Sequence, residues 1–272
     1  MSSRRRAAVR VVLVFLAVLL SLGTLGVLGA LAYGLSGLRL VTETEKLPYG
    51  VRLLTLDTGD IPLSVRLISD DDATEPRVNL RITANTDDIH LAVANEGASG
   101  RVTVLQSGSG FARFIRNGEI EVVLPPTVAR QLSMTVNQQS GSLSAHSDLD
   151  QLVANTHDGG VVLGGRARRV DINLHHGDIR TSTAIAVSDS FRAATESGGI
   201  SVDFRETPRT MEAVAEGDVT VRLPASGPYR VLAQSGARDG ETTVTVPQTT
   251  TPSAPLVMVH STGGSATVTE LR

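Results

Sequence analysis

Residues 170–180 read VDINLHHGDIR, and this stretch decides the expected fold. Val170, Ile172 and Leu174 alternate with two polar residues, which is typical of a strand with one apolar and one water-facing side. A turn centred on Gly177 follows, and a second apolar run begins at Ile179. The unit is therefore a strand, a glycine turn and another strand, with no residues left over for a helix.

The same unit recurs, and its turn glycines are 18 to 21 residues apart. The five turns occupy residues 140–143 (SGSL), 158–161 (DGGV), 176–179 (HGDI), 197–200 (SGGI) and 216–219 (EGDV). A repeat this short can bury its apolar side only by stacking on the next repeat. The sequence therefore predicts the all-β class and, within it, a single-stranded β-solenoid of short coils over residues 132–272.

Residues 51–131 also alternate between apolar and polar residues, as in 78–82 (VNLRI) and 120–124 (IEVVL), but their spacing is irregular. Repeat proteins need atypical end units that hide the core and block exposed strand edges. We therefore expect an irregular N-terminal β cap over residues 51–131.

The N-terminus carries a basic cluster, RRR at 4–6 and Arg10, followed by a long uncharged apolar segment. Residues 11–34 are long enough for a transmembrane helix, and the positive-inside rule places residues 1–10 in the cytoplasm as a basic tail. Residues 35–50 would be a linker. This predicts a single-pass plasma-membrane protein with an extracytoplasmic C-terminal domain. A cleaved signal peptide is the alternative, since residues 30–32 (ALA) have the small-x-small form of a cleavage site.

The amino-acid composition limits the classes of molecule that we expect the chain to bind. Aromatic residues make up 3% of the chain, tryptophan is absent, and the net charge is −3, so neither base-stacking platforms nor a basic footprint for nucleic acid is evident. The absence of cysteine excludes disulfides, thiol catalysis and thiolate metal sites. The expected partners are the plasma membrane and a cell-wall polysaccharide or another envelope protein, with no nucleic acid.

Residues 219–224 (VTVRLP), 228–231 (PYRV) and the pair Ser235-Gly236 resemble the putative-adhesin β-solenoid family of bacteria, whose members are often membrane-anchored. Residues 261–268 (STGGSATV) are similar to the closing coil of such proteins. The resemblance extends over residues 51–272 and implies a fold and an envelope location. That family has no settled activity, so no catalytic residue is carried over.

Two turn columns raise the question of metal binding. His157 and His175 both precede a turn glycine by two residues, and Gln139 and Glu196 hold the equivalent positions, so the four would form one column. Aspartates next to turns, which would suggest calcium, are Asp60, Asp88, Asp178 and Asp218. We expect both columns to be solvated turn ladders, with no metal and no cofactor.

Enzyme signals are weak, because the serine-hydrolase, zinc-protease and phosphate-binding-loop motifs are all missing. The enzyme alternative is a polysaccharide-cleaving groove lined by a charged set: Arg166, Arg168, Arg169, Asp171 and Asp178. A solvated face of mixed charge explains the same residues. We therefore expect that the chain has no catalytic residue and is not an enzyme.

The function predicted from sequence is that of a non-catalytic, membrane-anchored envelope protein, adhesin-like or a scaffold. An envelope-stress sensor signalling through the membrane helix is the alternative. A polysaccharide-active enzyme comes third.

Overall fold

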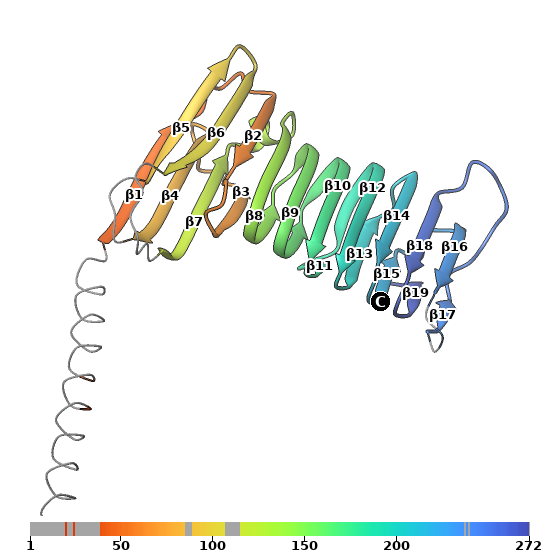
Figure 1. Ribbon diagram of the computed structural model, residues 1–272. Helices are drawn as coiled ribbons and strands as arrows, with labels where there is room; N and C mark the ends of the chain where they lie inside the picture. The colour runs from red at the N-terminus through yellow and green to blue at the C-terminus, as the bar shows by residue number, and fades with distance from the viewer. Residues whose placement is uncertain are drawn as a thin grey trace, which may run out of the picture.

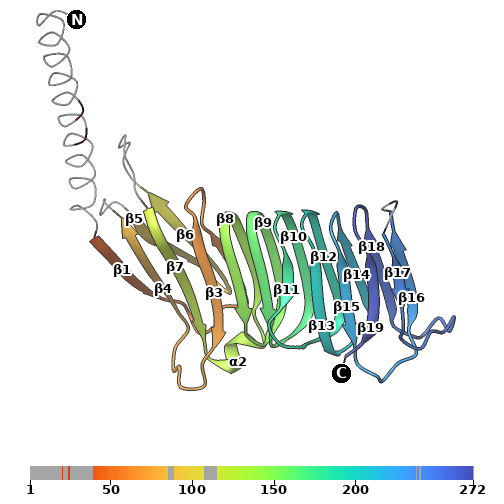
Figure 2. The ribbon, with the colours of Figure 1, turned by 90° about the horizontal axis from the view of Figure 1, so that it is seen from below.

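The structure is a computed structural model that describes residues 39–84, 89–106, 115–236, 238 and 240–271, together with Leu20 and Thr24. Among the described residues, helix is limited to the single turn α2 (Pro126–Ala129) and to Leu20 and Thr24, and the rest of the secondary structure is β. The predicted all-β class is therefore confirmed. The strands stack side by side into an elongated body (Figures 1 and 2).

The strands form two rows, joined at their turns, and most neighbours within a row are parallel. In stack order, the first row holds β5 (Ile89–Glu96), β6 (Ser99–Gln106), β2 (Leu53–Asp57), the first halves of β8 (Ser133–His146) and β9 (Leu149–Gly164), β10 (Arg166–His176), β12 (Ile185–Ser197), β14 (Thr210–Ala215), β18 (Leu256–Ser261) and β16 (Arg230–Ser235). The second row holds β1 (Arg39–Lys46), β4 (Arg77–Ala84), β7 (Ile115–Leu124), β3 (Leu63–Ser69), the second halves of β8 and β9, β11 (Ile179–Thr181), β13 (Ile200–Glu206), β15 (Val219–Leu223), β19 (Ala266–Glu270) and β17 (Thr242–Val244). A strand of the first row and the strand that follows it in the second row together make one unit, which we call a coil.

Alternation within each strand explains why the core lies between the rows. In β10, Val170, Ile172 and Leu174 are buried, whereas Asn173 is exposed. Ile172 is in register with alanines on both neighbouring coils, Ala154 and Ala193. The buried residues of all coils form one continuous apolar cluster. Small and aliphatic side chains suit this narrow interior, because the strands on either side are only about 4.8 Å away.

The turn glycines bring successive coils into close backbone contact. Gly141 is in register with Gly159, and both have positive φ, 126° and 142°. A β-carbon on Gly159 would lie 1.7 Å from the carbonyl oxygen of Gly141, and one on Gly177 would lie 1.5 Å from that of Gly159. No side chain fits into this spacing, which is why the turn position is glycine in each coil.

The stacking order departs from the sequence order at both ends. β18 and β19, the last strands of the chain, pair with β14 and β15 on one side and with β16 and β17 on the other (Figure 1). Near the N-terminus, β2 and β3 lie between β8 and the later strands β6 and β7. The predicted fold, in which coils follow one another in sequence after an irregular cap, is therefore wrong in its arrangement.

The N-terminal end of the stack is closed by antiparallel strands. β1 pairs with β4, β4 with β7, and β5 with β6, all antiparallel. Glu43 on β1 accepts a hydrogen bond from the backbone N–H of Leu91 on β5, with 2.6 Å between N and Oε2. A carboxylate that occupies an edge N–H reduces the tendency of that strand to pair with another chain.

The predicted transmembrane helix is not supported. No helix within the described residues is long and apolar enough to cross a membrane. The predicted span, 11–34, lies outside those residues apart from Leu20 and Thr24, as does the basic tail, 1–10. The fold class that included this helix, and the single-pass localisation inferred from it, are thus corrected. The sensor alternative, which required the helix, finds no support in the part of the chain that is described.

The division of the chain into residues 1–10, 11–34, 35–50, 51–131 and 132–272 stays a prediction.

Candidate functional site

The most distinctive surface feature is a shallow groove of about 440 Å³ that runs across β2, β8, β9 and β10. We call it the amide groove. It is lined by Asp57, Gly59, Asp60, Asn137, Gln138, Gln139, Asn155, Thr156, His157, Asn173 and His175. Almost all of these residues are polar, and the strand register places equivalent positions of successive coils next to one another.

Three asparagines form a hydrogen-bonded ladder along the groove, which we call the amide ladder. Asn137, Asn155 and Asn173 occupy equivalent positions on β8, β9 and β10. Asn155 Nδ2 donates to Asn137 Oδ1 at 3.0 Å, and Asn173 Nδ2 donates to Asn155 Oδ1 at 3.4 Å. Each amide has two N–H groups and two lone pairs, so the ladder leaves donors and acceptors available to a ligand.

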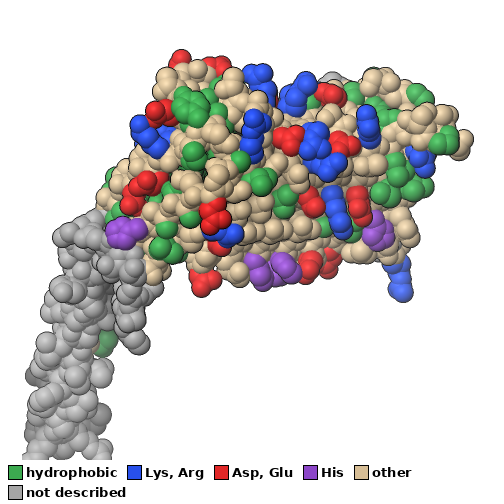
Figure 3. Space-filling view, turned by 90° about the horizontal axis from the view of Figure 1, so that it is seen from above, with side chains coloured by type: hydrophobic (Ala, Val, Ile, Leu, Met, Phe, Trp, Pro, Cys, Tyr) green, Lys and Arg blue, Asp and Glu red, His purple; other side chains and the backbone are tan. Residues whose placement is uncertain are grey.

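The predicted histidine column is present beside this ladder. The rings of His157 and His175 stack with centroids 4.7 Å apart, and His175 Nδ1 lies 2.9 Å from a carboxylate oxygen of Glu196. Gln139 lines the same groove. Histidine side chains gather along one long edge of the molecule, next to carboxylates (Figure 3). The sequence spacing therefore predicted which side chains meet here.

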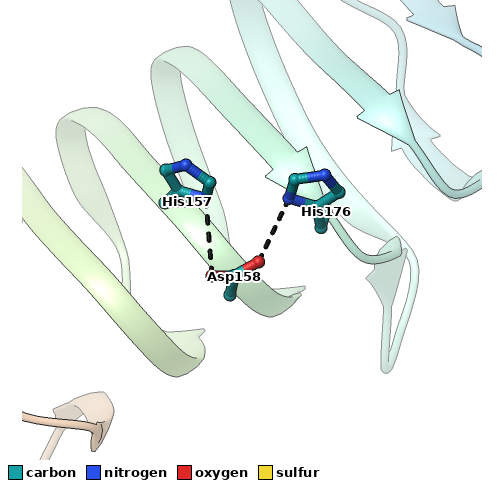
Figure 4. Close-up of side chains that lie close together, drawn as sticks. All are labelled: His157, Asp158 and His176. Carbon is teal, nitrogen blue, oxygen red and sulfur yellow. Dashed lines mark ion pairs between the residues drawn. The ribbon is translucent and has the colours of Figure 1, made fainter.

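Two residues of this edge were missed from the sequence. Asp158 precedes the turn glycine of β9, and His176 holds the equivalent place on β10. Asp158 Oδ1 lies 3.1 Å from His176 Nδ1, and Asp158 Oδ2 lies 3.4 Å from His157 Nδ1 (Figure 4). The signal that could have found them is the position one residue before each turn glycine, where Asp158 and His176 match as His157 and His175 do one residue earlier.

Two of the four aspartates considered for calcium, Asp178 and Asp218, form hydrogen bonds to the backbone of a neighbouring coil. Asp178 Oδ1 accepts a hydrogen bond from the Gly199 backbone N–H at 2.8 Å, and Asp218 Oδ1 accepts one from Ser265 N–H at 2.8 Å. Each carboxylate thus pairs with the turn backbone of the adjacent coil. Asp60 lies in an exposed turn at the amide groove, and Asp88 lies outside the described residues.

The charged set considered for catalysis makes ion pairs between coils. Arg168 donates to both carboxylate oxygens of Asp150, from Nε to Oδ1 at 2.8 Å and from a terminal nitrogen to Oδ2 at 2.9 Å. Arg169 Nε lies 2.7 Å from Asp189 Oδ2. Arg166 pairs with Glu206 at 3.4 Å, and Asp171 accepts a weak hydrogen bond from Asn173 at 3.4 Å. The partners of the three arginines are therefore Asp150, Asp189 and Glu206, not Asp171 and Asp178.

These pairs shift the acidity of the carboxyl groups. The hydrogen bond from Arg168 holds the pKa of Asp150 below its usual value, and Arg169 does the same for the pKa of Asp189. The pKa of Arg168 is raised by its hydrogen bond to Asp150. All these shifts favour the charged forms at neutral pH, which suits structural ion pairs and not a carboxyl group that exchanges protons during catalysis.

The ion pair between Asp150 and Arg168 makes the stability of the protein depend on pH. The folded-state pKa of Asp150 is depressed, so its contribution is present above the ordinary aspartate pKa and is lost as pH falls through the folded value. We expect Asp150→Asn to lower the free energy of unfolding slightly at pH 7 and to have a smaller effect at pH 2. Urea unfolding at both pH values measures this. A variant that is equally destabilised at the two pH values would contradict the role of the charge.

Comparisons with known proteins leave the family open. No family model and no curated protein matches the chain. Among solved structures, it is similar to a putative adhesin from Bacteroides fragilis, with 11% identity over 85% of this chain and 97% of the other, at a TM-score of 0.44. A putative adhesin from Parabacteroides merdae gives 12% identity, coverage of 86% and 97%, and a TM-score of 0.44.

A putative lipid binding protein from Parabacteroides distasonis is also similar, with 14% identity, coverage of 84% and 96%, and a TM-score of 0.43. The structural neighbours of this chain thus include bacterial putative adhesins. At this level of identity and structural overlap, the likeness decides nothing about what this chain binds.

Proposed function

We propose that this chain is a non-catalytic, adhesin-like binding protein that holds a hydroxyl-rich polymer, such as a cell-wall polysaccharide, along the amide groove. The observation that carries the proposal is the amide ladder of Asn137, Asn155 and Asn173. Sugar hydroxyl groups both donate and accept hydrogen bonds, and a carboxamide does the same. A ladder of amides at the spacing of the strands therefore offers a repeated binding unit to a repeated ligand.

The groove is also built for an extended ligand. It crosses four neighbouring strands, and its lining residues come from equivalent positions of successive coils. The rings of His157 and His175 stack at its edge, where they offer flat surfaces in a chain with few aromatic residues. A stack of hydrogen-bonded strands keeps these groups in fixed positions, so little ordering is required when the ligand binds.

A binding role fits the charged residues better than catalysis does. The carboxylates considered for a catalytic groove make hydrogen bonds within the fold: Asp178 accepts one from a turn of the next coil, and Asp171 accepts one from Asn173. A glycosidase needs two carboxyl groups facing one bond, with one of them kept protonated. Within the described residues, the resolved shifts in carboxyl pKa go the other way.

The proposal is tested by co-sedimentation of the purified chain with insoluble cell-wall polysaccharide. We expect Asn155→Leu to weaken binding about tenfold, because it removes the central amide of the ladder and each lost hydrogen bond is worth about 1 kcal/mol. Asn155 is exposed, so the substitution should leave the fold intact, which circular dichroism checks.

Ser201→Leu is the matched control, since Ser201 is an exposed strand residue on β13, in the other row of strands. It should bind as the unchanged chain does. Equal binding by the two variants would contradict the amide groove as the site, and capture of envelope proteins in place of polysaccharide would contradict the ligand. Release of reducing sugar ends during the assay would contradict a non-catalytic role.

A further inference from the structure

At the edge of the amide groove, three potential metal ligands come from two adjacent coils. His157 and Asp158 lie at the turn of β9, and His176 lies at the turn of β10, in register with Asp158. Figure 4 shows the Asp158 carboxylate between the two rings. One ligand atom from each residue lies within 4.8 Å of the other two.

The spacing suits a small divalent ion. The carboxylate oxygens of Asp158 lie 3.4 Å from His157 Nδ1 and 3.1 Å from His176 Nδ1. Two ligand atoms that each lie about 2.1 Å from a tetrahedral ion are about 3.4 Å apart. The three side chains therefore need only small rotations to converge on one ion.

The chemistry of the three ligands selects the class of metal. Two imidazole nitrogens and one carboxylate oxygen favour zinc and its transition-metal neighbours, whereas calcium and magnesium prefer sites made of oxygen. Sites with three protein ligands keep a position open for water or for a ligand. The side chains of His157, Asp158 and His176 are 43%, 56% and 58% exposed, so the three residues lie at the surface of the molecule.

An unsatisfied atom points to a ligand at this place. Nδ1 of His157 is shielded from solvent, yet it has no hydrogen-bond partner in the structure. A shielded ring nitrogen without a partner costs free energy that a bound metal ion would recover. Asp158 lies close to this nitrogen but does not satisfy it with a hydrogen bond.

The surroundings fix the ligands in place. The ring of His175 stacks on that of His157, with centroids 4.7 Å apart, and Glu196 orients His175 through a 2.9 Å contact. The backbones of the two turns are held in contact, since Gly177 approaches the Gly159 carbonyl too closely for any β-carbon. A site that is held by packing and outer contacts binds metal more tightly than a flexible one.

We propose that His157, Asp158 and His176 bind a divalent transition-metal ion of the zinc class at an exposed turn site with an open coordination position. His157 also lines the amide groove, whereas Asp158 and His176 do not, so these two ligands allow the metal site to be tested apart from polysaccharide binding.

The test is titration of the full chain, prepared without a histidine tag, with Zn²⁺ by isothermal calorimetry and with Co²⁺ by visible absorption. We expect one ion per chain and a tetrahedral cobalt spectrum. His176→Ala and Asp158→Asn should each weaken Zn²⁺ binding at least tenfold, because each removes one of three ligands, and circular dichroism should show that both variants are folded. Polysaccharide binding of these variants is measured separately, which distinguishes the failure of one proposal from the failure of the other.

His90→Ala is the matched control. His90 is also an exposed histidine beside a carboxylate, with Nδ1 3.7 Å from Glu43, but it lies on β5 at the far end of the stack. It should bind Zn²⁺ as the unchanged chain does. The proposal is overturned if the chain binds no Zn²⁺, if the His176→Ala and Asp158→Asn variants retain full affinity, or if Ca²⁺ binds more tightly than Zn²⁺. In the first case Asp158 would serve as an ion-pair partner of the two rings and nothing more.

Discussion

Replacing Gly159 with alanine should destabilise the stack of coils by at least about 3 kcal/mol, and we expect the variant to be largely unfolded. The new β-carbon would lie 1.7 Å from the carbonyl oxygen and 2.7 Å from the carbonyl carbon of Gly141. Both are backbone atoms of the adjacent coil, so no side-chain rotation relieves the clash. The φ of 142° adds further strain to any residue with a side chain. Guanidinium unfolding followed by circular dichroism measures the change.

Gly160→Ala is the matched control for this prediction. Its β-carbon would meet nothing closer than the Asp178 carbonyl oxygen at 3.6 Å, which is an ordinary contact. We expect this variant to change the free energy of unfolding by less than about 1 kcal/mol. If the two alanine variants were equally stable, the close approach of the turn backbones would be incorrect.

Ile172→Asp should have an effect of similar size for a different reason. Ile172 is fully buried and lies in register between Ala154 and Ala193, so a carboxylate there would have neither water nor a cation to pair with. Burying an unpaired charge costs several kcal/mol, a large part of the total stability of a domain. The expected result is loss of the cooperative unfolding transition.

Two variants separate the charge from the loss of packing. Asn173→Asp places the same charge on the exposed neighbour and should be tolerated. Ile172→Val removes one methylene group from the core and should cost about 1 kcal/mol. If Ile172→Asp and Asn173→Asp shifted the unfolding midpoint equally, the assignment of inward and outward faces would be wrong.

The faces of the strands and the glycine turns could be predicted because both are local properties. A strand alternates with a period of two, so Ile172 and Leu174 had to share a face and Asn173 had to take the other. Gly159 and Gly177 could be recognised as turns because an apolar run resumes directly after each. These predictions required no knowledge of which strand pairs with which.

The candidate site could be predicted only in part. His157 and His175 were expected to meet, because both lie two residues before a turn glycine. Asp158 and His176 were missed because neighbouring residues in a strand point to opposite faces. At the turn the strand geometry ends, and His175 and His176 are both exposed on the same edge, with side chains 51% and 58% exposed.

The sequence by itself therefore determined the all-β class, the inward face of the regularly alternating strands β10, β13 and β15, and the turn positions, since side-chain alternation and glycine act over a few residues. Only the tertiary structure decided the order of the coils, in which residues 256–270 fill the layer between residues 210–223 and residues 230–244. The physical reason is that every coil presents the same kind of strand edge and apolar face. A local pattern cannot choose among such equivalent neighbours, whereas packing of the complete chain can.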